Sequence, residues 1–121
     1  IINLIVDTGM RLSETLHKKD IFLSIDLTKG RKDRVVFYSA QISKLLQRWL
    51  RFKDTMQETE LLFPTQCTNT IISNPNFEKN FRGYSNRSKI NKYITPNVLR
   101  NNFSRRFILS GGSLTILSKI L

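Results

Sequence analysis

Three cations stand at positions where a fold could hold them rigidly, and together they could bind a phosphate. Arg11 follows a glycine turn at the start of an expected helix, Lys29 lies in a polar turn, and Arg100 lies on the polar side of another expected helix. Arginine contacts phosphate oxygens in a bidentate fork, whereas lysine supplies a mobile point charge. Such a clamp stabilises a phosphate transition state without a metal ion. The residues alone leave the choice of these three open, because the chain contains 20 lysines and arginines.

The chain has few of the residues that metal sites, disulfides or nucleotide-binding loops require. One histidine, His17, and one cysteine, Cys67, make a protein-only metal site improbable and exclude an internal disulfide. His17 precedes two lysines and is expected on a helix surface. No glycine-rich phosphate loop or dinucleotide fingerprint is present, since Gly30 stands alone in its turn. We therefore expect neither a metal nor a cofactor.

Charge favours a polyanionic partner. The 121 residues carry a formal net charge of +11, and residues 61–121 contain nine basic side chains against the single acid Glu78. Such a field attracts nucleic acid, although a solvated basic face or a membrane-surface patch would have the same composition. No apolar run approaches the roughly 18–20 residues of a membrane span, and residues 1–6 lack the features of a signal peptide. The expected DNA contacts are Arg31, Lys32, Arg34, Arg82, Arg87, Lys89, Lys92 and Arg105.

Local patterns predict the elements that must position these cations. Apolar spacing predicts helices at about residues 1–7, 11–18, 39–53, 76–90, 95–110 and 114–121, and alternation predicts strands at 21–27 and 34–38. Ser39 and Thr95 are suited to cap helices, Pro96 suits a first turn, and Gly9 suits a left-handed helix end. The two strands would form a hairpin with a basic tip, and residues 65–75 would form a polar loop.

The predicted fold class is mainly α with a small antiparallel β-hairpin, in one domain. Helical stripes outnumber strands, and only one pair of β-rich runs is present. The stripe on the 39–53 helix is more consistent with core packing than with a ligand site. The expected core consists of Leu4, Ile5, Leu12, Ile42, Leu45, Leu46, Trp49, Leu99, Phe103 and Phe107.

Four segments resemble motifs of the tyrosine recombinases, the family of phage integrases and Xer-type resolvases. Residues 8–14 (TGMRLSE) look like the first arginine box, and residues 29–36 (KGRKDRVV) resemble the hairpin that carries the catalytic lysine. Residues 95–103 (TPNVLRNNF) look like the His-x-x-Arg box, and residues 111–121 (GGSLTILSKIL) resemble the segment before the Leu-Gly-His turn. The order of the four segments makes the match strong, and it extends over nearly the whole chain. The resemblance implies the catalytic-domain fold of the family.

The resemblance also implies a reaction and roles for its residues. Family members cleave and rejoin DNA at specific sites through a 3′-phosphotyrosine link. Arg11 and Arg100 would contact the nonbridging oxygens of the scissile phosphate, and Lys29 would protonate the leaving 5′-oxygen. Lys32 lies near the same hairpin tip and is an alternative to Lys29. The implied partners are double-stranded DNA and other protomers in a tetrameric synapse, in the cytoplasm of a bacterium and acting on its nucleoid, with the protein encoded by the bacterium or by a phage.

Departures from the family pattern leave a second hypothesis open. Asn97 takes the place of the first histidine and cannot carry a proton near neutral pH, and Asn101 replaces another frequent histidine. The three tyrosines precede Arg100, which is the wrong order for the nucleophile. We therefore expect residues 1–121 to be a partial catalytic domain, inactive alone, with the tyrosine segment and an N-terminal DNA-binding domain elsewhere in a longer protein. The alternative is a recombinase-like repressor that binds DNA without cleaving it.

Overall fold

The computed structural model describes residues 1–17, 36–56 and 58–121, and within these ranges the regular structure is helical. An antiparallel bridge pairs Pro64 with Ile71 in the loop after α3. No helix in these ranges is long and apolar enough to span a membrane. The helices, in chain order, are α1 (Ile2–Thr8), α2 (Leu12–Leu16), α3 (Ala40–Met56), α4 (Asn74–Arg87), α5 (Pro96–Leu109) and α6 (Leu114–Ile120).

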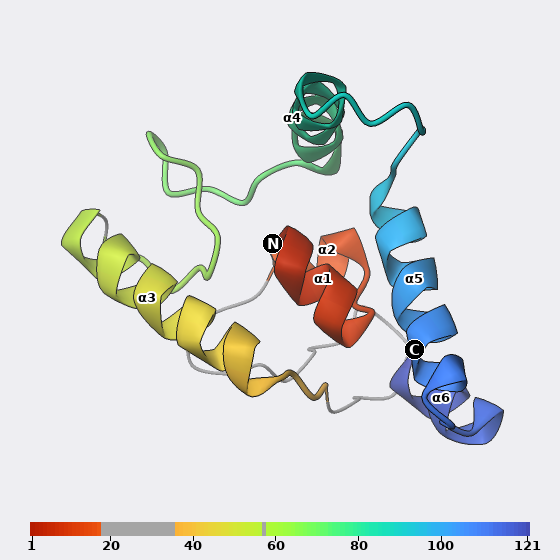
Figure 1. Cartoon of the computed structure of the whole chain (residues 1–121). Coiled ribbons are helices and arrows are strands. Elements are labelled where there is room, and N and C mark those ends of the chain that lie inside the picture. Colours follow the sequence, from red (N-terminus) through yellow and green to blue (C-terminus); the bar gives the residue numbers. More distant parts are fainter. Residues whose placement is uncertain (18–35, 57) are drawn as a thin grey trace.

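The two short N-terminal helices form the centre around which the longer helices are arranged (Figure 1). α1 packs against α5 on one side and α3 on the other, while α2 contacts α4. α6 folds back beside the end of α5. The turn between α1 and α2 therefore lies within reach of helices that come from the far end of the chain.

Buried apolar side chains form two clusters on either side of α1 and α2. The first joins Leu4 and Met10 to Ile42 on α3 and to Leu62 and Phe63 in the following loop, with Val36 completing it. The second contains Ile5, Leu12 and Leu16, with Phe77 of α4 and Leu99 of α5 packed against it. Because both clusters include residues next to the α1–α2 turn, burial fixes the position of that turn.

Serine or threonine side chains cap the beginnings of α3, α4, α5 and α6. Thr95 Oγ1 accepts a hydrogen bond from the Val98 amide at 3.3 Å, and Pro96 follows in the first turn of α5 as predicted. Ser39 Oγ accepts from the Ile42 amide at 3.4 Å, and its own amide donates to Asp7 Oδ2 at 2.6 Å. The predicted cap positions at Ser39 and Thr95 are thereby confirmed.

The sequence-based boundaries need several corrections. The helix expected at 76–90 begins two residues earlier, because Ser73 Oγ accepts from the Asn76 amide and Pro75 occupies the first turn, and it ends at Arg87. The expected hairpin at 21–38 falls mostly outside the described residues, and its described end, residues 36–38, is not a strand. Leu45 was expected in the core, but it is 44% exposed because it lies at the rim of an apolar groove.

Candidate active site

The turn that carries Arg11 is fixed by contacts on both sides of it. Gly9 ends α1 with a left-handed conformation (φ 70°), which glycine adopts without steric penalty. Arg11 then precedes the first residue of α2, and its backbone amide donates to Glu14 Oε2 at 2.9 Å. Its Nη1 donates to Glu14 Oε1 at 3.2 Å, and the side chain remains 37% exposed. The Glu14 carboxylate therefore orients the Arg11 guanidinium, part of which stays accessible to solvent.

Arg100 lies one turn into α5, and a residue after α6 holds its side chain in place. Its Nη2 donates to the Leu121 carbonyl oxygen at 3.1 Å, and its Nε is buried. The side chain is half-buried, in contrast to that of Arg105 on the same helix, which is exposed. Arg100 is thus a fixed cation of the fold, whereas Arg105 is a surface cation.

A close packing contact joins the Arg11 turn to the helix that carries Arg100. A Cβ on Gly9 would overlap the ring of Phe103 and approach a methyl group of Leu121 to 3.0 Å. Phe103 is one turn after Arg100 on α5, and Leu121 is the residue whose carbonyl binds Arg100. The turn that precedes Arg11 and the side chain of Arg100 therefore both lie against Leu121, where α1 packs on α5.

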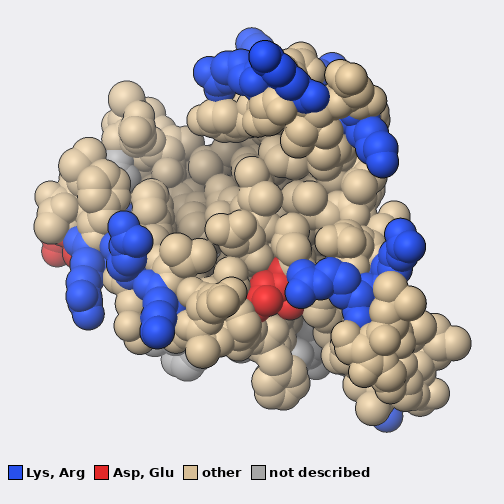
Figure 2. Space-filling model, in the orientation of Figure 1, with Lys and Arg blue, Asp and Glu red and all other residues tan. Residues whose placement is uncertain are grey.

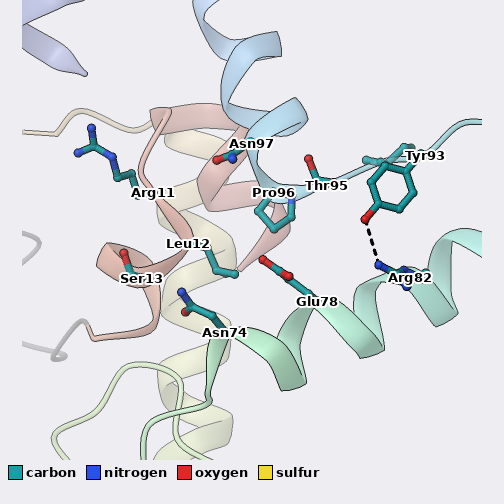
Figure 3. A pocket seen from close by; sticks show the side chains of 11 residues that line it. Arg11, Leu12, Ser13, Asn74, Glu78, Arg82, Tyr93, Thr95, Pro96 and Asn97 are labelled. Carbon is teal, nitrogen blue, oxygen red and sulfur yellow. Dashed lines mark hydrogen bonds between the residues drawn. The ribbon is translucent and has the colours of Figure 1, made fainter.

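Asn97 shares a pocket with Arg11 (Figure 3). The pocket has a volume of 320 Å³ and lies between α2, α4 and the beginning of α5. Figure 3 shows the Asn97 amide on the first turn of α5, between the Arg11 turn and the Glu78 carboxylate. The remaining lining residues are Leu12, Ser13, Asn74, Arg82, Tyr93, Ile94, Thr95 and Pro96.

The predicted DNA contacts fall into three groups. Arg82 lines the pocket, whereas Arg87, Lys89, Lys92 and Arg105 are exposed outside it. Figure 2 shows cations gathered over α4 at the top and over α3 at the lower left. The expected catalytic Lys29 and the expected contacts Arg31, Lys32 and Arg34 lie outside the described residues.

Glu78 and Tyr93 also line this pocket, although no sequence pattern gave either of them a role in a site. Glu78 is the single acid of residues 61–121, which was noted only as an exception to the charge. Tyr93 lies in the irregular segment before α5, and no periodicity links it to α4. The nearness of Thr95, a clear helix start, is the signal that could have drawn attention to it. In the described residues, no group of three His, Cys, Asp or Glu side chains could hold a metal ion.

Comparison with known protein families shows which family the chain belongs to. The phage integrase family matches it over residues 1–121. The chain belongs to the phage integrase family. The resemblance seen in the four sequence segments is therefore confirmed at the level of the family.

Relatives within the phage integrase family are tyrosine recombinases. The tyrosine recombinase XerC of Haemophilus influenzae is 27% identical over 128 residues, which span 100% of this chain and 43% of that protein. The tyrosine recombinase XerD of Brucella suis is 26% identical over 124 residues, spanning 94% of this chain and 40% of that protein. The chain thus spans less than half the length of these relatives.

Solved structures of recombinases have the same fold. The crystal structure of XerA recombinase superposes with a TM-score of 0.88 and 26% identity, covering 98% of this chain and 46% of that chain. The structure of the XerH site-specific recombinase, bound to its difH substrate in a pre-cleavage complex, superposes with a TM-score of 0.78 and is 26% identical in sequence. The match covers 99% of this chain and 37% of that chain. The predicted mainly helical fold of a phage integrase catalytic domain is therefore confirmed.

Proposed function

We propose that this chain supplies the phosphate-binding part of a site-specific tyrosine recombinase. The observation that carries the proposal is the packing described above, which brings the turn before Arg11 and the side chain of Arg100 against the same residue, Leu121, although they are far apart in the sequence. A protein that only binds DNA needs surface cations and has no use for two arginines that partners within the fold hold in place. The recombinase relatives support the same function, and none of those named above is a repressor.

In the proposed reaction, a tyrosine supplied by another part of the protein attacks the scissile phosphate. A bond forms between the tyrosine oxygen and phosphorus, and the bond from phosphorus to the 5′-oxygen breaks. Arg11 and Arg100 would neutralise the nonbridging oxygens, where charge accumulates in the transition state. Lys29 would give its proton to the leaving 5′-oxygen. Asn97 would donate a hydrogen bond to the phosphate, but it cannot accept the proton of the tyrosine, which would pass to a water molecule.

The proposed substrate is double-stranded DNA, cut within a synapse of recombinase protomers in the cytoplasm. The XerH structure supports this choice, because that relative was captured on a DNA substrate. The basic side chains outside the pocket would contact the DNA backbone and position the strand, since phosphate contacts carry little sequence information. Binding by this chain should accordingly weaken steeply as salt rises.

The proposal is tested by covalent trapping with the full-length protein. The substrate is a nicked duplex that loses a short fragment after cleavage, so that the protein–DNA adduct accumulates and is counted on a denaturing gel. Arg100→Ala should slow adduct formation by about 100- to 1000-fold, the usual effect of removing one preorganised donor to a developing oxyanion. The rate of adduct formation by Arg100→Lys should fall between those of the unmodified protein and Arg100→Ala, because lysine keeps the positive charge but loses the bidentate guanidinium fork.

The matched control is Arg48→Ala, which removes an exposed cation from α3. Adduct formation by this variant should stay within about twofold of the unmodified protein, because a surface charge contributes little. Melting curves establish that each variant is folded. Efficient adduct formation by Arg100→Ala, or no adduct from an unmodified protein that binds the duplex, would overturn the proposal.

A further inference from the structure

The pocket has a second cationic end that the proposed reaction does not use. Arg82 Nη2 on α4 donates to the phenol oxygen of Tyr93 at 3.0 Å (Figure 3). The guanidinium carbon also lies 5.4 Å from the centre of the Tyr93 ring, within the range of a cation–π contact. Both side chains line the pocket. A contact across eleven residues of sequence thus fixes an otherwise exposed arginine at the wall of the site.

Glu78 lies between this end of the pocket and the Arg11 end. It is one turn before Arg82 on α4, a spacing that commonly allows an ion pair. Among the described residues, however, Arg82 is bound to Tyr93, and the ion pair in this region joins Arg11 to Glu14. Figure 3 shows the Glu78 carboxylate below Pro96, with Arg11 on one side and Arg82 on the other. Because a carboxylate repels a phosphate, one phosphate cannot bridge the two arginines across it.

We propose that Arg82 and Tyr93 form a separate site for a second phosphate of the DNA strand, next to the phosphate held at the Arg11 end. The guanidinium uses one nitrogen for Tyr93 and keeps further N–H donors for a phosphate. The Tyr93 hydroxyl accepts from Arg82 and thereby holds the guanidinium at the wall of the pocket. Tyr93 is then the positioning residue of Arg82. The inference rests on the proposed function, because it takes DNA as the ligand.

The chain offers a matched control for this pair on the same helix. Arg87 lies over the ring of Tyr84, with its guanidinium carbon 4.7 Å from the ring centre. Both residues are on α4, both are exposed, and neither lines the pocket. The control pair therefore has a similar cation–π contact and the same charge, but Arg87 would meet the DNA backbone only as one of the exposed cations outside the pocket.

The experiment measures binding of the 121-residue chain to an uncleavable fluorescent duplex by anisotropy, over a series of salt concentrations and with two unrelated DNA sequences. Arg82→Ala should weaken binding about tenfold or more on both sequences, and should lower the magnitude of the log–log salt slope by about 0.9. Arg87→Ala should weaken binding by less than about threefold. Melting temperatures of all variants should match that of the unmodified chain, because the altered side chains are exposed.

A double-mutant cycle tests the role of Tyr93. Tyr93→Phe should weaken binding about threefold while leaving the salt slope unchanged, because the charge of Arg82 remains. In the Arg82→Ala background the same change should have no effect, since Tyr93 acts through Arg82. Tyr84→Phe should have no effect in either the unmodified or the Arg87→Ala background.

Equal losses from Arg82→Ala and Arg87→Ala would overturn the inference, because Arg82 would then be an ordinary surface charge. A loss that differs between the two DNA sequences would overturn it too, because the contact would be to a base. Either result leaves the proposed function intact. Failure of the unmodified chain to bind DNA at any salt concentration would overturn the proposed function, and the inference with it.

Discussion

Two regions of the molecule carry arginines on helices, and they differ in what holds the side chains. On α3, Lys44, Arg48 and Arg51 form an exposed stripe, and in the described part of the chain none of them has a hydrogen-bond or ion-pair partner. At the pocket and beside Leu121, each arginine has a fixed partner. Arg11 is bound by Glu14, Arg82 by Tyr93 and Arg100 by the Leu121 carbonyl. The comparison indicates that the fixed partner, rather than the charge itself, distinguishes a site cation from a solvated one.

The α3 stripe and the Arg11 turn also differ in how closely other elements pack around them. The inner face of α3 is held to the following loop, where Trp49 Nε1 donates to the Leu62 carbonyl at 2.6 Å. The buried Lys53 Nζ donates to the carbonyls of Thr59 and Leu61, each at 3.0 Å. The outer face of α3, which carries Lys44, Arg48 and Arg51, is exposed within the described part of the chain. The Arg11 turn, by contrast, is enclosed by α5 and by Leu121, so that a change there should reach the site directly.

The largest expected effect comes from filling the space at Gly9. Gly9→Ala would place a Cβ against Phe103 in a left-handed backbone conformation, which should lower the free energy of unfolding by roughly 2–4 kcal/mol. Gly83→Ala is the matched control, because no atom lies within 4 Å of a Cβ there and α4 is helical. It should raise the free energy of unfolding by about 0.5–1 kcal/mol. Urea unfolding of both variants measures the difference, and equal stabilities would refute the close packing of α1 on α5.

The smallest expected effect comes from removing the α3 stripe. The triple variant Lys44→Ala, Arg48→Ala, Arg51→Ala should leave adduct formation by the full-length protein within about threefold, since exposed and unpartnered charges contribute little individually. The adduct assay described above for Arg100 provides the measurement. A loss comparable to that of Arg100→Ala would show that α3 takes part in the reaction, and the distinction between the two regions would then fail.

Sequence patterns predicted the local parts of this structure well. Ser39, Thr95 and Gly9 mark helix ends through their own backbone and side-chain chemistry, and the structure places them as expected. Leu45 was predicted wrongly, because a periodic stripe gives the direction of a helix face but not how far its neighbours cover it. The β-hairpin that would carry Lys29 stays a prediction, since it lies outside the described residues.

The site was predictable only in part, for a physical reason. Arg11, Asn97 and Arg100 could be selected because they stand in segments that resemble family motifs. Glu78 and Tyr93 stand in no such segment, and they enter the pocket through contacts between α4 and the segment before α5. Such contacts depend on how elements pack, and no local spacing in the sequence encodes them.

A chemical-shift map of the DNA-bound chain tests the central claim most directly. The isotope-labelled 121-residue chain is titrated with an uncleavable duplex, and backbone amide shifts are followed by nuclear magnetic resonance. We expect the largest changes at residues 9–13 and 95–100, which frame the Arg11 and Arg100 ends of the site, with small changes on the outer face of α3. Shifts concentrated at Lys44, Arg48 and Arg51, with residues 9–13 and 95–100 unmoved, would contradict the account.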